Sequence, residues 1–587
     1  MHHNKIQKLE LTWIGKDDGR ENIEPRILIE EPKYSYGDPE SGNMLIHGDN
    51  LLALKALEQE YSGQVKCIYI DPPYNTGSAF EHYDDNLEHS IWLELMYKRV
   101  NFLKNLLSDD GVLCCQIDDS EGAYLKVMLD EVFGRSNYLA TFYIQVRYPN
   151  KTLAEDSDYQ KIIEQCHVYA KQKNLVKLNR PKVEYDTSKF KWKVTELSDG
   201  EEIILGGKRV VIFKNGQYSI DEIPPSINGL KETWATGSLA RVKASAGEFF
   251  ELHLSERKGT DGLGCLYKVY GIGEDSLGYR YISGPKKITA NKGKFYSGIP
   301  VKRIEELKNG GSYKFLPVSN FYDLAGPFGN CRLEGSVDFK GGKKPESLIE
   351  IILRYYTDKG DLVLDSFLGS GTTAAVAQKM GRRYIGIELG NHAYTHCYPR
   401  LKKVTDGTDQ GGISKAQNWK GGSGFKFYEL APSLLKEDKF GNLIINKEYN
   451  ADMLAAAMAK QEGYIYQPDT TLYWKQGQSS EHDYIYTTTQ FLTVESLDAI
   501  SETMQEGESL LICCTAFQKE CTTHHPNITV KKIPQMLLGR CEFNKDNYNL
   551  NIIDMPKMDE EDDIEDNDIP KDSDTEYNKI DNPTLFD

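Results

Sequence analysis

The sequence lacks a long apolar run and a loop for binding nucleoside triphosphates. No segment approaches the roughly 20 consecutive apolar residues of a transmembrane helix, and the start, Met1 to Lys8, is too polar for a signal peptide. We therefore expect a cytoplasmic protein that does not associate with a membrane. The pattern Gly-x-x-x-x-Gly-Lys-Ser/Thr does not occur, which excludes a recognisable ATP-driven motor.

Cysteine spacing of the kind that holds zinc is also missing. The adjacent pairs Cys114-Cys115 and Cys513-Cys514 lie in apolar, strand-like runs, which favours packed, reduced thiols over disulfides. A zinc site could be drawn from the later cysteines and two histidines: Cys513, Cys514, Cys521, His524 and His525. Adjacent strand residues point to opposite faces of a sheet and no C-x2-C spacing is present, so we expect no metal.

The chain also lacks the overall positive charge that is typical of a nucleic-acid-binding protein, since its net charge is −18. The charge is unevenly placed, however. Residues 554–587 contain 14 acidic and 3 basic residues, whereas residues 151–320 contain 28 basic and 21 acidic residues. A basic middle inside an acidic chain favours a localised phosphate-binding surface, although a solvated face is the alternative.

Strands alternate with helices in two separated stretches of the chain. The first runs from Asn43 to Ile117 and the second from Pro345 to Leu389, with short buried runs such as Val65–Ile70 and Leu362–Asp365. This alternation predicts the α/β class, with a doubly wound, Rossmann-like parallel sheet covered by helices on both faces. One sheet is therefore expected to be assembled from two halves.

The stretch between the halves is rich in Gly, Lys and Tyr, and has turn signals at Gly206-Gly207 and Asn215-Gly216. It predicts an inserted domain that is mostly β. We expect six parts in order: an N-terminal arm (1–42), the first half of the α/β domain (43–150), the insert (151–320), the second half (321–424), a C-terminal α+β domain (425–553) and an acidic, disordered tail (554–587).

A glycine loop joins the strand Leu362–Asp365 to the next predicted helix. Gly369 and Gly371 allow a sharp turn and a close approach of the backbone to a ligand, and the helix start offers free N–H groups. Glu388 closes the following strand, where a carboxylate can accept hydrogen bonds from both ribose hydroxyls. The pattern indicates a nucleotide-like ligand, but does not separate S-adenosylmethionine from a dinucleotide.

The tetrapeptide Asp71-Pro72-Pro73-Tyr74 follows the buried strand Val65–Ile70. Ligands of open α/β sheets bind at this carboxyl edge. The Asp71 carboxylate and the Pro72 carbonyl could both accept hydrogen bonds from an exocyclic amine and so free its lone pair for attack on a methyl sulfonium. The two prolines would hold these acceptors in place. A simple strand-ending turn is the alternative.

With both motifs present, the chain resembles the amino-methyltransferases of DNA modification, in the permuted β class. The resemblance implies that Asp71 to Tyr74 contact a base flipped out of double-stranded DNA, and that Asp rather than Ser at position 71 favours N6 of adenine over N4 of cytosine. It also implies a set of S-adenosylmethionine-binding residues: Asp49, Asp365, Phe367, Gly369, Ser370, Gly371, Thr372 and, for the ribose, Glu388. The insert would then be the target-recognition domain.

A narrower resemblance is to the modification subunits of type III restriction systems. It rests on Leu11–Asp17, on Asn75-Thr76-Gly77 and on Gly421–Leu430. It implies a homodimer that reads a short asymmetric site and joins a helicase–nuclease restriction subunit, with residues 425–553 as the dimer or partner domain. A solitary adenine methyltransferase, an enzyme acting on RNA and a catalytically idle recognition subunit remain as alternatives.

Overall fold

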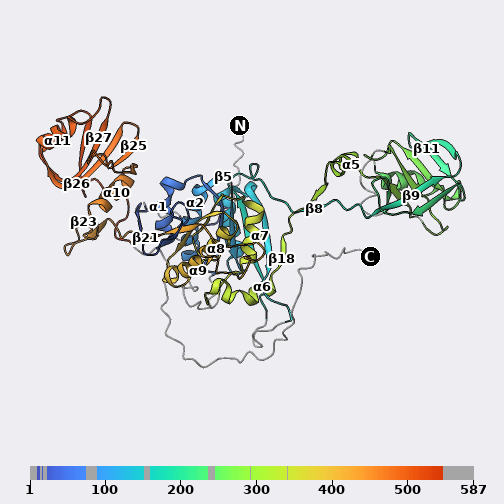
Figure 1. Ribbon diagram of the computed structural model, residues 1–587, viewed down its shortest axis with the longest axis horizontal. Helices are drawn as coiled ribbons and strands as arrows, with labels where there is room; N and C mark the ends of the chain where they lie inside the picture. The colour runs from blue at the N-terminus through green and yellow to red at the C-terminus, as the bar shows by residue number, and fades with distance from the viewer. Residues whose placement is uncertain are drawn as a thin grey trace, which may run out of the picture. The chain divides into compact units, whose positions relative to one another are not determined.

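The computed structural model describes residues 10–13, 16, 23–74, 89–150, 159–235, 245–275, 277–290, 292–339 and 342–545 (Figure 1). Within these residues the chain divides into two compact units. One unit is Asn179–Ser319, and the other contains the described residues on both sides of it. None of the described helices is long and apolar enough to cross a membrane. The Asn75-Thr76-Gly77 motif and the acidic tail lie outside the described residues.

The larger unit is built on a mixed sheet, 11-stranded within the described residues. Its order is β1 (Leu28–Glu30), β21 (Gly424–Leu430), β3 (Met44–His47), β20 (Arg383–Glu388), β19 (Leu362–Asp365), β4 (Val65–Ile70), β5 (Leu107–Ile117), β7 (Ile163–Ala170), β6 (Tyr138–Gln145) and β18 (Phe321–Asp323), with β2 (Tyr36–Gly37) paired to β21. The strands from β21 to β5 are all parallel. Segments far apart in sequence, blue and yellow in Figure 1, thus share one sheet.

Helices cover both faces of this sheet. Side chains that point to either face of the strand β4 are therefore buried. Ile68 and Ile70 of β4 belong to one core with α1 (Asn50–Tyr61), α2 (His89–Leu106) and α3 (Gly122–Leu129). The alternate residues Cys67 and Tyr69 are equally buried, and α7 (Glu346–Tyr356) packs against β4 and β5. The remaining helices of this domain are α6 (Ala325–Asn330), α8 (Thr372–Lys379) and α9 (Tyr398–Thr405). The predicted α/β class is confirmed, in a sheet that is mixed rather than wholly parallel.

The structure corrects three predicted boundaries. The insert does not begin at residue 151, because β7 lies between β5 and β6 in the main sheet and the separate unit begins only at Asn179. The C-terminal domain does not begin at residue 425, because β21 pairs in parallel with β3. The predicted N-terminal arm (1–42) is not separate from the α/β domain throughout, since β1 pairs with β21 of the main sheet. Strands β1 and β21 pair with segments far away in the sequence, whereas β7 pairs with β6, the strand just before it.

The unit Asn179–Ser319 contains an antiparallel sheet, eight-stranded in its described part. Its order is β10 (Glu201–Leu205), β11 (Lys208–Phe213), β14 (Leu266–Tyr270), β15 (Tyr279–Ser283), β16 (Lys294–Ser297), β13 (Leu230–Trp234), β9 (Phe190–Glu196) and β12 (Tyr218–Glu222). Outside this sheet lie β8 (Lys182–Glu184), which pairs with β17 (Tyr313–Phe315), and the helices α4 (Ala246–Phe249) and α5 (Val301–Lys308). Gly206-Gly207 closes the predicted hairpin. Asn215-Gly216 does not, because β11 and β12 pair with other strands.

The C-terminal domain follows β21. It contains the hairpin of β22 (Leu435–Glu437) with β23 (Leu443–Ile445), the helices α10 (Ala451–Gln461) and α11 (Val494–Ser501), and a sheet of β24 (Ile465–Tyr466), β25 (Gly477–Ser480), β26 (Asp483–Leu492), β27 (Ser509–Phe517) and β28 (Ile528–Lys532). Cys513 lies in a core with α10 and Cys514 in a core with α11, so the adjacent cysteines point to opposite faces as predicted. Every cysteine of the sequence lies in the described ranges, and all eleven are free thiols.

Candidate active site

The two predicted motifs meet at one edge of the main sheet. Strands β4 and β19 are parallel neighbours, with Leu364 opposite Ile68, so Asp71, which follows β4, and Asp365, which ends β19, lie at the carboxyl ends of adjacent strands. Strand β20, which ends in Glu388, is the next neighbour of β19. Carboxylates from three neighbouring strands are therefore gathered where open α/β sheets bind their ligands.

The Asp71 carboxylate has two partners, a hydroxyl group and a lysine ammonium. The Tyr74 hydroxyl donates to Asp71 Oδ1 over 2.7 Å. Lys344 Nζ, from the segment that precedes α7, lies 3.2 Å from Asp71 Oδ2 and 4.8 Å from the centre of the Tyr74 ring. Lys344 directly precedes the second predicted stretch, which begins at Pro345, and the structure brings it into contact with the tetrapeptide.

Glu164 completes the cluster and was not predicted from the sequence. It lies on β7, and its Oε2 is 2.9 Å from the Tyr74 hydroxyl and 3.3 Å from Lys344 Nζ. Gln116 of β5 donates to the same oxygen over 2.7 Å. The Tyr74 hydroxyl thus lies between the carboxylates of Asp71 and Glu164. The available signal was a lone acidic residue in the apolar run Ile163–Ala170, which sequence reasoning assigned to the insert.

The ionisation of Asp71 reflects its burial and these neighbours. Burial raises the pKa of Asp71 to about 6, Lys344 opposes this increase and the negative charge of Glu164 adds to it. Burial alone would lower the pKa of Lys344, but Asp71 and Glu164 raise it overall. At neutral pH the site therefore contains the Lys344 ammonium beside the Asp71 carboxylate.

The backbone of the tetrapeptide is anchored from α2. The indole of Trp92, a fully buried residue, donates through Nε1 to the Pro73 carbonyl over 2.8 Å. Together with the fixed φ angles of Pro72 and Pro73, this bond holds the loop after β4. Pro72 is buried, whereas Asp71, Pro73 and Tyr74 are partly exposed. A ligand can therefore reach the side chains of Asp71 and Tyr74.

The glycine loop takes the conformation that its sequence requires. Gly369 and Gly371 have φ angles of 57° and 80°, and a Cβ at Gly371 would lie 3.3 Å from Cys397 Cα. Helix α8 begins at Thr372, directly after Gly371. The buried Glu388 carboxylate accepts from Gly369 N over 2.8 Å and from Gly390 N over 2.9 Å. The strand-end carboxylate thereby fixes the glycine loop beside it.

Asp365, the last residue of β19, forms hydrogen bonds with residues on both sides of the glycine loop. Its two oxygens accept from Phe367 N over 2.9 Å and from the Thr373 hydroxyl over 2.5 Å. Burial raises its pKa to about 7, with further contributions from Asp71 and Glu388. The neighbouring Ser366 hydroxyl is buried and has no hydrogen-bond partner among the described residues. It is therefore a polar group that a ligand could satisfy.

Asp49 is the N-cap of α1, and both of its carboxylate oxygens have partners within the protein. Its Oδ1 accepts from Leu51 N and Leu52 N at the start of α1, and its Oδ2 lies 3.3 Å from the buried Arg99 guanidinium. The adjacent Asn50 donates to the Ser366 carbonyl over 2.7 Å. Asp49 thus lies next to the predicted cofactor loop, and its contacts within the protein are those of a structural anchor.

A buried network of charges lies behind Ser370 and Thr372. Arg400 Nη1 donates to the Thr372 hydroxyl over 2.8 Å and to the Ser370 carbonyl over 3.2 Å. Arg400 Nη2 and Lys379 Nζ each lie 2.8 Å from the Glu346 carboxylate, and all three side chains have no measurable exposure. The opposite charges lower the pKa of Glu346 despite the effect of its burial. This network ties the start of α8 to α7 and α9.

The chain matches a family model described as DNA methylase over residues 65–241 and 287–398. It is 36% identical to the probable type III restriction-modification enzyme HindVI Mod subunit of Haemophilus influenzae, over 68% of this chain and 55% of that protein. It is 27% identical to the EcoPI Mod subunit of Escherichia phage P1, over 65% of this chain and 62% of that protein. It is 24% identical to the EcoP15I Mod subunit of Escherichia coli, over 76% of this chain and 75% of that protein.

The chain thus spans little more than half the length of the first of these relatives. Among solved structures, the PvuII DNA methyltransferase (cytosine-N4-specific) aligns at 13% identity and a TM-score of 0.30, over 68% of this chain and 98% of that chain. The matched family model contains β4 with the tetrapeptide, β19 with the glycine loop and β20. The chain therefore matches the DNA methylase family model across the candidate site, and it is similar to the Mod subunits of type III restriction-modification enzymes.

Proposed function

We propose that this protein transfers a methyl group from S-adenosylmethionine to N6 of an adenine in double-stranded DNA, as the modification subunit of a type III restriction-modification system. One observation carries the proposal. The tetrapeptide Asp71 to Tyr74 follows β4 at the same sheet edge as the glycine loop and Glu388. A base bound at the tetrapeptide would therefore face a methyl donor bound at the glycine loop.

The residues around the glycine loop fit S-adenosylmethionine. Glu388 would accept hydrogen bonds from the ribose hydroxyls in addition to those from Gly369 N and Gly390 N, because a carboxylate oxygen can accept more than one. The unpartnered Ser366 hydroxyl supports a polar ligand group nearby. Phe367, partly buried against the core, would contribute an aromatic surface. When bound, the cofactor supplies an electrophilic methyl group on a sulfonium.

The tetrapeptide suits a planar amine as substrate. The Asp71 carboxylate and the Pro72 carbonyl would each accept a hydrogen bond from the NH₂ group of adenine, which draws its lone pair out of conjugation with the ring. Taking the base out of the duplex costs a few kcal/mol, and stacking on the Tyr74 ring would return about 1–3 kcal/mol. Anchoring by Trp92 keeps the two acceptors at a fixed spacing, as positional catalysis requires.

Lys344 and Glu164 would act as positioning residues. Lys344 holds Asp71 in its ionised, accepting form, and Glu164 holds the Tyr74 hydroxyl from the other side. After methyl transfer the nitrogen must lose one proton. Asp71 is the carboxylate that would face it, and the Tyr74 hydroxyl bridges Asp71 to Glu164. A proton taken by Asp71 can therefore move through Tyr74, which gives up its own proton to Glu164.

The remaining parts would serve DNA recognition and assembly. The net positive charge of residues 151–320 supports a DNA-contacting role for the unit Asn179–Ser319, and exchange of that unit tests it. The sequence has no triphosphate loop, so ATP hydrolysis and cleavage would reside on a separate restriction subunit. The C-terminal domain is the candidate surface for that subunit or for a second copy of the chain. Light scattering and co-purification test these two assignments.

The test of the activity uses the purified full chain with labelled S-adenosylmethionine and unmethylated genomic DNA. We expect label in N6-methyladenine after enzymatic digestion, and none with Asp71→Asn. The matched control is Asp452→Asn, an exposed carboxylate on α10, which should methylate like the unchanged protein. Label found only in N4-methylcytosine, or no label at all, would reject the proposal.

A further inference from the structure

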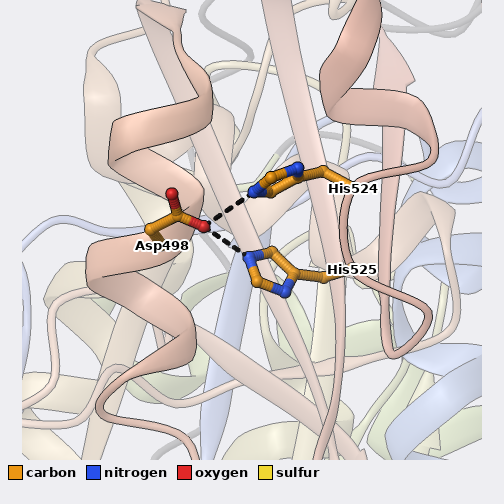
Figure 2. Close-up of side chains that lie close together, drawn as sticks. All are labelled: Asp498, His524 and His525. Atoms are coloured by element: carbon orange, nitrogen blue, oxygen red, sulfur yellow. Dashed lines mark hydrogen bonds and ion pairs between the residues drawn. The ribbon is translucent and has the colours of Figure 1, made fainter.

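Two histidines and one aspartate converge in the C-terminal domain, far along the chain from the tetrapeptide. Asp498 lies on α11, and His524 and His525 follow the 3-10 helix Lys519–Thr522. Figure 2 shows both imidazole rings directed at the same carboxylate oxygen. The Nε2 atom of His524 lies 2.8 Å from Asp498 Oδ1, and that of His525 lies 2.9 Å from it. The three ligand atoms all lie within 4.8 Å of one another.

We propose that Asp498, His524 and His525 form a binding site for a divalent transition-metal ion. Metal–nitrogen and metal–oxygen bonds of about 2.0–2.1 Å at right angles place neighbouring ligand atoms about 2.8–3.0 Å apart. Both observed nitrogen–oxygen distances fall in this range. An ion at the open side of the cluster could therefore bind all three atoms after small side-chain rotations.

The donor set selects the class of metal. Two imidazole nitrogens and one carboxylate oxygen suit Ni²⁺, Cu²⁺, Co²⁺ or Zn²⁺, whereas Mg²⁺ and Ca²⁺ prefer oxygen ligands alone. The side chain of Asp498 is 49% exposed and that of His524 is 36% exposed, so the ion can enter from solvent and retain water at its other positions. The nearby Cys521 is fully buried and donates to the Leu492 carbonyl, which leaves a site without thiolate ligands.

Hydrogen bonding from both histidines to Asp498 is the competing account of the same geometry. Asp498→Asn separates the two. The amide oxygen of asparagine can still accept from both Nε2–H groups, but a neutral amide is a much weaker metal ligand than a carboxylate. A site that only stabilises the fold by hydrogen bonds would be little changed by this substitution, whereas a metal site would lose affinity.

Binding would link α11 to the segment before β28. Asp498 comes from the crossover between β26 and β27, and His524 and His525 come from the crossover between β27 and β28. An ion held by both would join two connections of one parallel sheet. Because the unfolded chain does not present the three ligands together, the metal should raise the stability of the C-terminal domain by linkage.

The experiment is a calorimetric titration of the full chain with Ni²⁺, together with thermal unfolding with and without the ion. All proteins compared carry His2→Ala and His3→Ala, because these neighbouring histidines in the sequence could bind nickel themselves. We expect one bound ion, a metal-dependent rise in the unfolding temperature, and an affinity loss of about tenfold or more in Asp498→Asn and in His525→Ala.

The matched control is His482→Ala, which removes another exposed histidine of the same domain and should bind nickel unchanged. Equal nickel affinity in the parent protein, Asp498→Asn and His525→Ala would overturn the proposal. An absence of binding in the parent protein, with a normal unfolding transition, would overturn it equally. Both readouts are independent of methyl transfer, so neither depends on the proposed function.

Discussion

Lys344 Nζ lies 3.2 Å from Asp71 Oδ2, although the two residues belong to opposite halves of the split sheet. Lys344 enters the site just before α7, while Asp71 follows β4. Their contact means that the tetrapeptide is completed only when both halves of the α/β domain have come together. It also gives Asp71 a charged partner whose effect on its ionisation can be measured.

Substitutions of Lys344 and Glu164 should move the pH dependence of methylation in opposite directions. Burial raises the pKa of Asp71 to about 6, Lys344 opposes this increase and Glu164 adds to it, and the ionised carboxylate is the stronger hydrogen-bond acceptor for the amine. The rate should therefore fall below about pH 6 in the unchanged protein. Lys344→Gln should shift this fall to higher pH and Glu164→Gln to lower pH, by about one unit or more.

The measurement is kcat/KM for methyl transfer between pH 5 and 9, with the fold of each variant checked by circular dichroism. Lys415→Gln, which removes an exposed charge, should leave the profile unchanged. Folded, active variants whose profiles shift in the same direction, or do not shift, would contradict the assigned roles of Lys344 and Glu164.

Glu388→Gln should weaken S-adenosylmethionine binding about tenfold or more, because hydrogen bonds to a charged group contribute about 1.5–3 kcal/mol each. Calorimetry measures the affinity. A 2′-deoxyribose analogue of the cofactor provides the control, since the variant should lose less affinity for it than for the parent cofactor. Equal losses for both ligands would indicate that Glu388 acts only by holding Gly369 N and Gly390 N.

Glu346→Ala should destabilise the α/β domain by about 3–5 kcal/mol, because it leaves the buried guanidinium of Arg400 without its carboxylate partner, while Lys379 keeps its ion pair with Asp409. Urea unfolding monitored by fluorescence gives the free energy of unfolding. Glu350→Ala on the same helix, where the side chain is only partly buried, should change it by about 0.5 kcal/mol or less. Similar effects of both substitutions would contradict the structural importance of the network.

Exchange of residues 179–319 for the corresponding unit of a relative should change the methylated site and retain adenine chemistry. The structure defines these limits, since a graft from residue 151 would remove β7 and with it Glu164. Methylome sequencing reads the result. An unchanged site after a folded exchange would move recognition to another part of the chain.

The sequence predicted where the tetrapeptide and the glycine loop lie in the sheet, because each motif is a short pattern of neighbouring residues. A buried strand followed by Asp71-Pro72, and another followed by Gly369 and Gly371, imply one sheet edge once the strands are taken as parallel neighbours. Glu164 could not be found in this way, because its position depends on the antiparallel pairing of β7 with β5. That pairing brings together strands separated by other elements, and composition alone did not distinguish β7 from the insert.

The same limit applies at two other places in the chain. The alternating run Gly424–Leu430 would fit any half-buried sheet, and only its pairing with β3 assigns it to the α/β domain. Asp49 stays a predicted cofactor contact, and its bonds with Leu51 N and Leu52 N also make it the N-cap of α1. Residue type restricts the possible roles, and tertiary contacts select among them.

The most direct test of the proposed function is single-molecule sequencing of DNA from cells that express this chain alone, compared with cells that express Asp71→Asn. We expect N6-methyladenine in one short recurring sequence context with the unchanged chain and its complete loss with the variant. DNA that contains only N4-methylcytosine, or adenine methylation that persists in Asp71→Asn, would contradict the role of the tetrapeptide and the proposed function with it.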